Sequence, residues 1–119
     1  MKIAINNYYG GWALPIQMIE ELGYDPRTED RYRNDPKLVE LIMKDIIHNE
    51  KSVYGIAEIP DEVTDWEISE YDGWEEVTYV LDGKIHHGHA ELFRILDDDE
   101  GNRIIDNLNM LKEYKEETK

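Results

Sequence analysis

The central stretch of the chain, residues 52–83, alternates apolar and polar side chains in the manner of β-strands. Val, Ile, Trp and Tyr recur at about every second position, and Asp-Gly pairs at 72–73 and 82–83 interrupt the alternation. Because Asp-Gly is a preferred hairpin turn, we expect strands joined by two hairpins, at residues 66–71, 74–81 and 84–86. An earlier strand over residues 52–60 ends at Pro60. The pattern predicts a β-meander with one apolar face and one strongly acidic face.

The first residues predict a strand, a loop and a short helix. Residues 2–5 are a β-branched run typical of an interior strand. Residues 15–22 have helical spacing of apolar side chains, with Pro15 in the first turn and Gly23 as the stop. The loop between them combines turn-forming amides, aromatic rings and glycines: Asn6, Asn7, Tyr8, Tyr9, Gly10 and Gly11. Such a loop forms either a tight connection or the mouth of a ligand pocket.

A second helix is expected over residues 36–48, because apolar side chains recur there on one stripe. Asn34 or Asp35 caps its start, with Pro36 in the first turn. The polar connection before it carries three arginines that neighbouring acids neutralise, so we expect a solvated loop: Arg27, Arg31 and Arg33.

The last third of the chain gives a weaker pattern. Residues 91–96 fit either a strand or a helix, and residues 97–102 form an acidic loop that lacks the ligand spacing of a calcium site. Residues 103–117 predict a closing helix, and the final residues, 112–119, are expected to fray.

These segments predict an α+β fold, mainly an antiparallel sheet made by the N-terminal strand and the acidic meander and packed against two to three helices. With 119 residues, the chain is expected to form a single domain over residues 1–119. No apolar run suggests a membrane span or leader, and there is no cysteine, so we expect a cytoplasmic protein without membrane contact.

The formal net charge is −15, from 28 acidic and 13 basic residues, which argues against direct nucleic-acid binding. Residues 52–83 contain no Lys, Arg or His. An acidic surface of this kind suits the basic surface of a partner protein, and it equally suits a solvated face that prevents edge pairing. The candidate partner-binding residues are Glu58, Asp61, Glu62, Asp65, Glu67, Glu70, Asp72, Glu75 and Glu76.

Histidines cluster at His86, His87 and His89. They are candidates for a metal or self-association site, and the alternative is an exposed hairpin arm. The spacing matches no established ligand pattern, and we expect no cofactor.

Two segments, KIAINNYYGGW at the start and AEIPDEVTDWEISEYDGWEEV later, resemble a family of small uncharacterised phage and prophage proteins. The resemblance covers roughly residues 1–23 and 57–77. The chain departs from that pattern at Pro15, where a Ser-type cap is expected, and after Val77. The resemblance implies an accessory protein in the cytoplasm of a bacterial host, and the family supplies no activity.

Binding rather than catalysis is therefore expected, since no nucleophile–base pair or two-carboxylate arrangement can be identified. The first hypothesis is an acidic inhibitor or modulator of a host nucleic-acid enzyme or defence protein. Acids on alternate strand positions lie about 7 Å apart, close to the phosphate spacing of one nucleic-acid strand. The alternatives are a small-ligand module using residues 6–11, or a metal or self-association site at the histidines.

Overall fold

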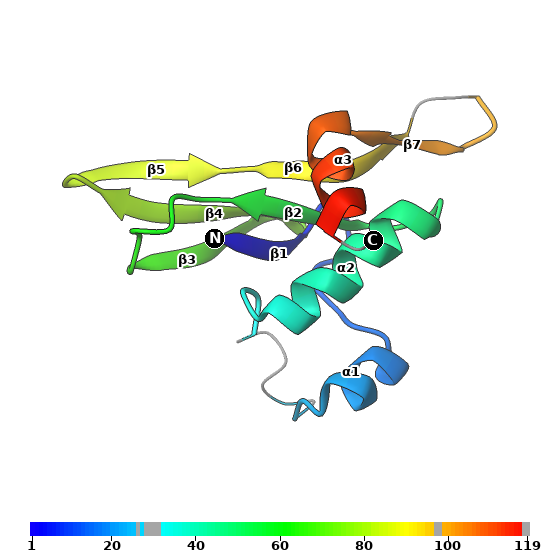
Figure 1. Ribbon diagram of the computed structural model, residues 1–119, viewed down its shortest axis with the longest axis horizontal. Coiled ribbons are helices and arrows are strands. Elements are labelled where there is room, and N and C mark those ends of the chain that lie inside the picture. The colour runs from blue at the N-terminus through cyan, green and yellow to red at the C-terminus, as the bar shows by residue number, and fades with distance from the viewer. Residues whose placement is uncertain (26, 28–31, 97–98, 118–119) are drawn as a thin grey trace.

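The computed structural model describes residues 1–25, 27, 32–96 and 99–117. These residues form a strand, two helices, six further strands and a final helix (Figure 1). The elements are β1 (Lys2–Asn6), α1 (Ile16–Leu22), α2 (Pro36–His48), β2 (Tyr54–Glu58), β3 (Trp66–Tyr71), β4 (Trp74–Leu81), β5 (Lys84–Gly88), β6 (Ala90–Leu96), β7 (Arg103–Asp106) and α3 (Leu108–Glu117). Helices and antiparallel strands together confirm the predicted α+β fold.

The strands form two antiparallel sheets, one with the order β1-β2-β6-β7 and one with the order β3-β4-β5. Only His89 separates β5 from β6, so the chain passes directly from the smaller sheet into the larger one. The register of β2 against β6 shifts between Ile56 and Ala57, which leaves Glu91 as the extra residue of a β-bulge. A bulge bends its strand. Here the bend lets β5 and β6 follow each other directly in the chain while they belong to different sheets.

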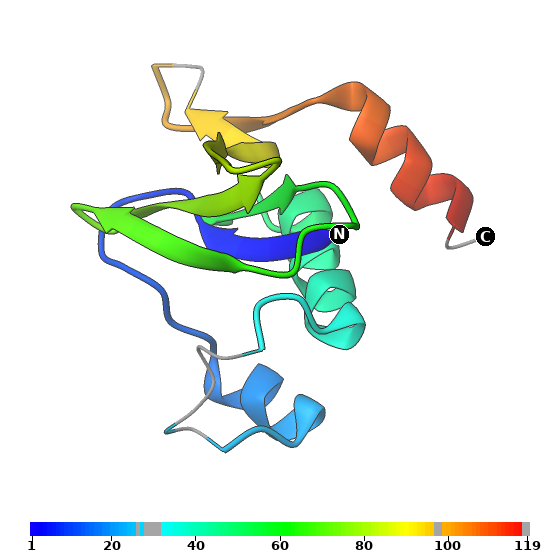
Figure 2. The same ribbon diagram turned by 90° about the vertical axis from the view of Figure 1, so that its left-hand side faces the viewer.

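The four-stranded sheet is covered on both faces. Because side chains alternate along a strand, β1 directs Ala4 toward the helices and directs Ile3 and Ile5 toward the smaller sheet. In Figure 2, α2 lies on one side of β1 and the β3–β4 hairpin on the other. The helix-side core includes Ile19, Leu38, Ile42, Ile46, Ile56, Leu92, Met110 and Tyr114. The core between the sheets includes Ile3, Ile5, Ala57, Ile59, Val63 and Val77.

The end of α1 and the start of α2 follow the predicted signals, whereas Pro15, expected in the first turn of α1, lies just before it as the N-cap residue. α1 ends at Gly23, whose φ of 74° is the left-handed conformation expected of a C-terminal glycine. The Asp35 carboxylate accepts the backbone N–H of Lys37 at 3.0 Å and so caps α2. At the other end of α2, the Arg94 guanidinium donates to the carbonyl of Ile47 at 2.6 Å. A basic group is favourable there because it meets the negative end of the helix dipole.

The structure corrects the predicted meander. β2 pairs with β1 and β6 rather than with β3, and residues 59–65 carry the chain from one sheet to the other. The hairpins at Asp72–Gly73 and Asp82–Gly83 are confirmed, with β3 paired to β4 and β4 to β5. Alternation predicts a strand without naming its neighbour, and this explains the error.

The C-terminal prediction also needs correction. Residues 103–106 form β7, paired with β6, rather than the first turn of a helix. Asn107 has a φ of 56°, a left-handed conformation that belongs to neither a strand nor a right-handed helix. β7 therefore ends before it and α3 begins after it, at Leu108. α3 continues to Glu117 and buries Tyr114, and the fraying expected of residues 112–119 stays a prediction. The predicted loop residues 97–98, the terminal residues 118–119 and Arg31 lie outside the described residues.

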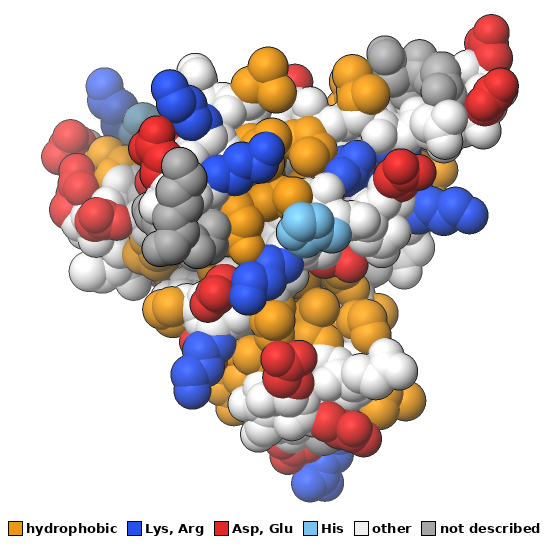
Figure 3. Space-filling view, turned by 45° about the vertical axis from the view of Figure 1, so that its right-hand side comes forward, with side chains coloured by type: hydrophobic (Ala, Val, Ile, Leu, Met, Phe, Trp, Pro, Cys, Tyr) orange, Lys and Arg blue, Asp and Glu red, His pale blue; other side chains and the backbone are white. Residues whose placement is uncertain are grey.

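The surface combines apolar and charged regions. Figure 3 shows hydrophobic side chains gathered across the middle of one face, with charged side chains of both signs around them. In the described part of the chain, no helix has the length and apolar character needed to cross a membrane. Large apolar side chains that are exposed include Tyr9, Ile16, Tyr71, Trp74, Ile85, Ile104 and Leu108.

Candidate partner-binding site

A buried ion pair joins β4 to the loop before α2. Nη1 and Nη2 of Arg33 donate to Oε1 and Oε2 of Glu75 at 2.8 and 3.1 Å, and each side chain is 6% exposed. The same Glu75 Oε1 accepts the backbone N–H of Asn6 at 2.7 Å, and Arg33 Nη1 reaches the Ala4 carbonyl at 3.3 Å. β1 is the edge strand of its sheet, so these bonds satisfy peptide groups on its free side.

Two sequence predictions change at this ion pair. Arg33 is buried rather than part of a solvated loop, and Glu75 is engaged in the interior rather than free for a partner. The Arg33 guanidinium carbon also lies 3.7 Å from the centroid of the Trp12 ring, and Trp12 meets Tyr54 edge to face at 5.5 Å. The carboxylate that neutralises Arg33 stands 42 positions away in the chain, which is why the local sequence did not reveal it.

The loop at residues 6–11 packs against the turn between β3 and β4. The buried Asn6 amide donates to the carbonyls of Tyr8 and Gly73, each at 2.6 Å. Gly73 has a φ of 91°, and a Cβ at this position would lie 2.5 Å from the backbone nitrogen of Gly11. Only glycine fits such an approach, so the loop and the turn form a close-packed joint. We call the contacts of Asn6, Gly73, Arg33 and Glu75 the joint.

Aromatic rings lie on the solvent side of the joint. The ring centroids of Tyr8, Tyr9 and Trp74 are separated by 5.5, 6.1 and 5.7 Å, in tilted and edge-to-face arrangements. Tyr71 pairs with Trp74 across the turn. Tyr71 is 80% exposed, Tyr9 65% and Trp74 38%. Exposed rings held by their neighbours are a common feature of protein-binding surfaces.

Carboxylates and histidines share this outward face. The β3–β4 register places Glu67 opposite Thr78, and Ser69 opposite Glu76, on the same face as Tyr71. Glu76 accepts from Nδ1 of His87 and of His89 at 3.2 and 3.4 Å when these rings are protonated there. We call the set Tyr9, Tyr71, Trp74, Glu67 and Glu76 the aromatic face.

A hollow of about 320 Å³ opens beside the aromatic face. It brings together members of all three candidate groups, since loop, acidic and histidine residues line it: Asn7, Ser69, Glu70, Tyr71, Trp74, Glu75, Glu76, His89 and Ala90. The Ser69 hydroxyl bonds that of Thr78 at 2.9 Å rather than a base, and Glu70 accepts the Gly73 N–H at 3.1 Å. Its volume is at the low end of the roughly 300–1,000 Å³ of small-molecule sites.

The remaining candidate acids are exposed but do not lie on the outward face of the β3–β4–β5 sheet. Glu58 ends β2 in the larger sheet, and Asp72 lies in the β3–β4 turn. Three more lie in the connection at residues 59–65: Asp61, Glu62 and Asp65. Asp61 binds the amino group of Met1, and this hydrogen bond lowers the pKa of the carboxyl. The outward sheet face therefore carries Glu67 and Glu76 among aromatic and hydroxyl groups, which corrects the strongly acidic face predicted from alternation.

Two of the three clustered histidines converge, and the third does not. His87 and His89 meet Glu76, whereas His86 lies on the other face of the sheet and stacks on Tyr79 with 5.3 Å between ring centroids. Within the part of the chain that the structure describes, no group of three or more His, Cys, Asp or Glu side chains is placed to hold a metal ion.

Tyr71 and Trp74 are not among the partner-binding residues predicted from the sequence, although both lie exposed on this face. A usable signal was present, because the Asp72–Gly73 turn fixes the register and sets these two rings opposite each other on the face that carries Glu67. The burial of Glu75 had no comparable local signal.

No family model matches the chain. Comparison with curated proteins and with solved structures found no match either. The resemblance of the two motifs to phage proteins therefore stays a prediction.

Proposed function

We propose that this protein acts by binding: its aromatic face docks on a basic surface of another protein. The concrete form of the proposal is a phage-type accessory protein that inhibits or modulates a host nucleic-acid enzyme or defence protein by occupying its cationic groove. Such grooves are rich in Lys and Arg because they bind phosphates.

The exposed rings of Tyr71, Trp74 and Tyr9, set beside the carboxylates of Glu67 and Glu76, carry this proposal. Aromatic residues dominate the energetic centres of protein interfaces because they bury a large area at a small cost in side-chain entropy. Their faces also attract Arg and Lys, by about 0.5–2 kcal/mol for each cation–π contact.

Electrostatics supports a basic partner. The formal net charge of −15 repels phosphate and attracts cationic surfaces from a distance, which speeds association at low salt. The exposed Glu70 and Asp72 stand at the same turn as Tyr71 and add to the negative potential there. Charge of this kind affects the association rate, whereas the rings determine how long the complex lasts.

The test is capture of proteins from a bacterial lysate on the immobilised protein, at about 50 mM and about 500 mM salt. The test variant is Tyr71→Ser with Glu67→Gln. The matched control is Ile16→Ser with Glu20→Gln, which removes an exposed apolar side chain and one acid on α1, since Ile16 is 74% exposed. We expect a nucleic-acid-binding protein that is retained by the control and lost, by about tenfold or more, with the test variant.

The captured protein is then purified and assayed on its own nucleic acid. Wild-type protein should reduce that binding or cleavage in proportion to its concentration, and the Tyr71 variant should need about ten times more. Equal capture by both variants, or a captured enzyme whose activity is unchanged at saturation, would refute the proposal.

A further inference from the structure

The hollow of about 320 Å³ beside the aromatic face carries more negative charge than the described basic side chains around it neutralise. Three carboxylates line it, and Arg33 neutralises that of Glu75. Glu70 accepts the backbone N–H of Gly73, and the ion pairs of Glu76 are with histidine rings. Neither Lys nor Arg is among the described residues that line the hollow. The hollow is therefore suited to a cation that comes from outside the chain.

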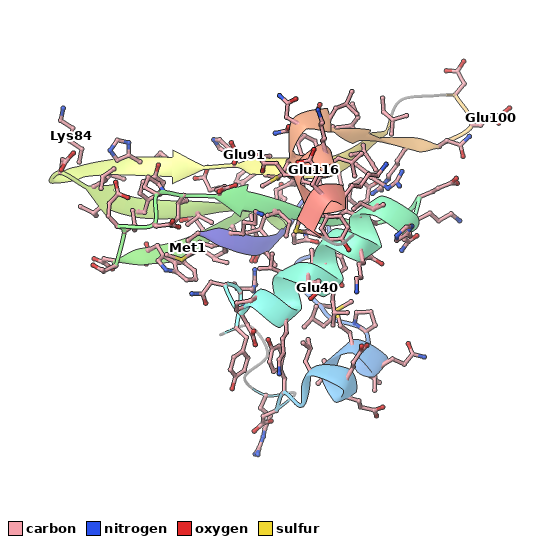
Figure 4. The ribbon with its side chains drawn as sticks, viewed as in Figure 1. Met1, Glu40, Lys84, Glu91, Glu100 and Glu116 are labelled. Atoms are coloured by element: carbon pink, nitrogen blue, oxygen red, sulfur yellow. The ribbon has the colours of Figure 1, made fainter. Side chains whose placement is uncertain are left out.

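Two basic side chains of the surrounding elements are held elsewhere. Lys84 stands at the tip of the β4–β5 hairpin (Figure 4), whereas Trp74 begins β4 at the other end of that strand. The eight residues of β4 span about 24 Å. The Arg103 guanidinium lies over the Tyr8 ring, 4.2 Å from its centroid, and donates to the Ser52 carbonyl at 2.7 Å. Lys84 is thus too distant to neutralise the hollow, and Arg103 is already engaged.

β4 binds an arginine of this chain on its inward face. Glu75 accepts from Arg33 through both carboxylate oxygens, and the guanidinium carbon lies 3.7 Å from the centroid of the Trp12 ring. Glu76, the next residue, points to the opposite face of the sheet together with Trp74. The outward face therefore repeats the combination of a carboxylate and an indole, without the arginine. A guanidinium suits this combination because its planar fork matches a carboxylate and its face stacks on a ring.

The outward groups are accessible to a partner. Tyr71 and Trp74 are exposed, and the Glu76 side chain is 32% exposed. The side chains of His87 and His89, which meet Glu76, are 53% and 74% exposed. These two rings are held by few neighbours, so they can turn into solvent and leave the carboxylate to a ligand.

We infer, as an extension that rests on the proposed function, that this hollow binds an arginine side chain of the partner protein. The guanidinium pairs with Glu76 and lies against the rings of Tyr71 and Trp74, and Glu70 adds negative potential. A lysine pairs with the same carboxylate but lacks the planar group that stacks on the rings.

The two histidines make this binding depend on pH. Nδ1 of His87 and of His89 lies 3.2 and 3.4 Å from the two carboxylate oxygens of Glu76. A neutral ring can leave Nδ1 without a hydrogen, whereas a protonated ring carries hydrogen on both nitrogens and a positive charge. Histidine ordinarily gains this proton near about pH 6.5, so acid conditions occupy Glu76 and repel the guanidinium. The other charged and titratable groups around Glu76 belong to β3, the β3–β4 turn and the joint: Glu67, Glu70, Tyr71, Asp72, Glu75 and Arg33.

An NMR titration with N-acetyl-arginine methylamide tests the inference, and the lysine analogue at equal ionic strength is the control for charge. At about pH 7.5 the arginine analogue should shift the amides of Ser69 and Trp74, leave that of Val39 on α2 constant, and bind at least about threefold more tightly than the lysine analogue. Glu76→Gln should weaken binding at least about fivefold. The matched control, Asp82→Asn, removes the same charge at the far end of β4 and should change binding less than about twofold.

The second arm repeats the titration at about pH 5.5, where wild-type binding should fall at least about threefold. The variant His87→Asn with His89→Asn should bind equally at both pH values, and the amide spectrum shows that each variant is folded. No shifts, equal binding of the two analogues, equal loss in Glu76→Gln and Asp82→Asn, or a pH effect that persists without the histidines would each overturn the inference.

This titration uses no partner protein, so its outcome is separate from that of the lysate capture. A captured partner without shifts from the arginine analogue would refute the inference alone. Shifts without a captured partner would refute the proposed function and leave the arginine site standing.

Discussion

Removing one partner of the Arg33–Glu75 pair is the perturbation that tests the joint most directly. In Glu75→Gln, Arg33 stays buried without a counter-charge, while a side-chain oxygen is kept for the Asn6 N–H. Because both side chains are only 6% exposed, little water reaches the orphaned charge. Breaking a buried pair in this way costs about 3–5 kcal/mol. Domains of this size are stable by about 5–15 kcal/mol, so we expect a large fraction of the stability to be lost.

The second half of the test removes both charges. Arg33→Met leaves Glu75 uncompensated and should cost about as much as Glu75→Gln, whereas the double variant should cost less than either single change. Urea unfolding at neutral pH, followed by tryptophan fluorescence and far-UV circular dichroism, gives the four free energies of the cycle. The exposed Glu40–Lys44 pair is the control, and its removal should cost far less than either single change at the buried pair. Single variants that cost less than about 1 kcal/mol, or a double variant equal to their sum, would refute the reasoning.

Three further variants have expected outcomes from the same geometry. Gly73→Ala should lower the melting temperature more than Gly83→Ala: both have positive φ, but only a Cβ at Gly73 meets the backbone, 2.5 Å from the Gly11 nitrogen. Glu91→Gln should stabilise the protein at pH 7 by up to about 1 kcal/mol. Burial raises the pKa of Glu91, so the folded state loses stability as the pH rises from the carboxyl's unfolded pKa through its folded pKa; the gain measured by thermal unfolding should therefore vanish once the pH falls below the unfolded pKa. Asp35→Ala should cost about 1 kcal/mol in urea unfolding, because it removes the cap of α2, and equal stability would contradict that role.

Much of the fold could be predicted from the sequence, because short local patterns determine where the helices and hairpins begin and end. Pro36 and Asp35 mark the start of α2, Gly23 ends α1, and the two Asp-Gly turns set the hairpins. These residues act through their own backbone preferences, so a few neighbouring positions in the sequence are enough to predict where each helix or hairpin begins or ends. The partner of β2 was not readable, because pairing between strands far apart in sequence depends on contacts that alternation alone does not specify.

The sequence predicted the groups of residues that form the candidate site, but not that the fold brings them together. The residues at 6–11, the acids and the histidines were each identified, and the structure brings Asn7, Glu76 and His89 to one hollow. Their meeting depends on the joint, in which Arg33 bonds a carboxylate 42 positions away. A charged side chain beside local acids looks solvated in sequence, and only the tertiary structure shows that its counter-ion lies in the interior.

The joint also bears on binding, although its residues lie beneath the aromatic face. Tyr9 and Trp74 come from segments far apart in the chain, and they meet because Gly73 fits against Gly11 and Glu75 pairs with Arg33. Rings fixed in advance lose little entropy when a partner arrives, so a rigid joint favours affinity. A variant of the joint that still folds should therefore bind the partner of the aromatic face more weakly, with a faster dissociation rate, even though it touches no partner atom. If a folded Glu75→Gln protein dissociates from the partner at the wild-type rate, the joint does not contribute to binding by the aromatic face.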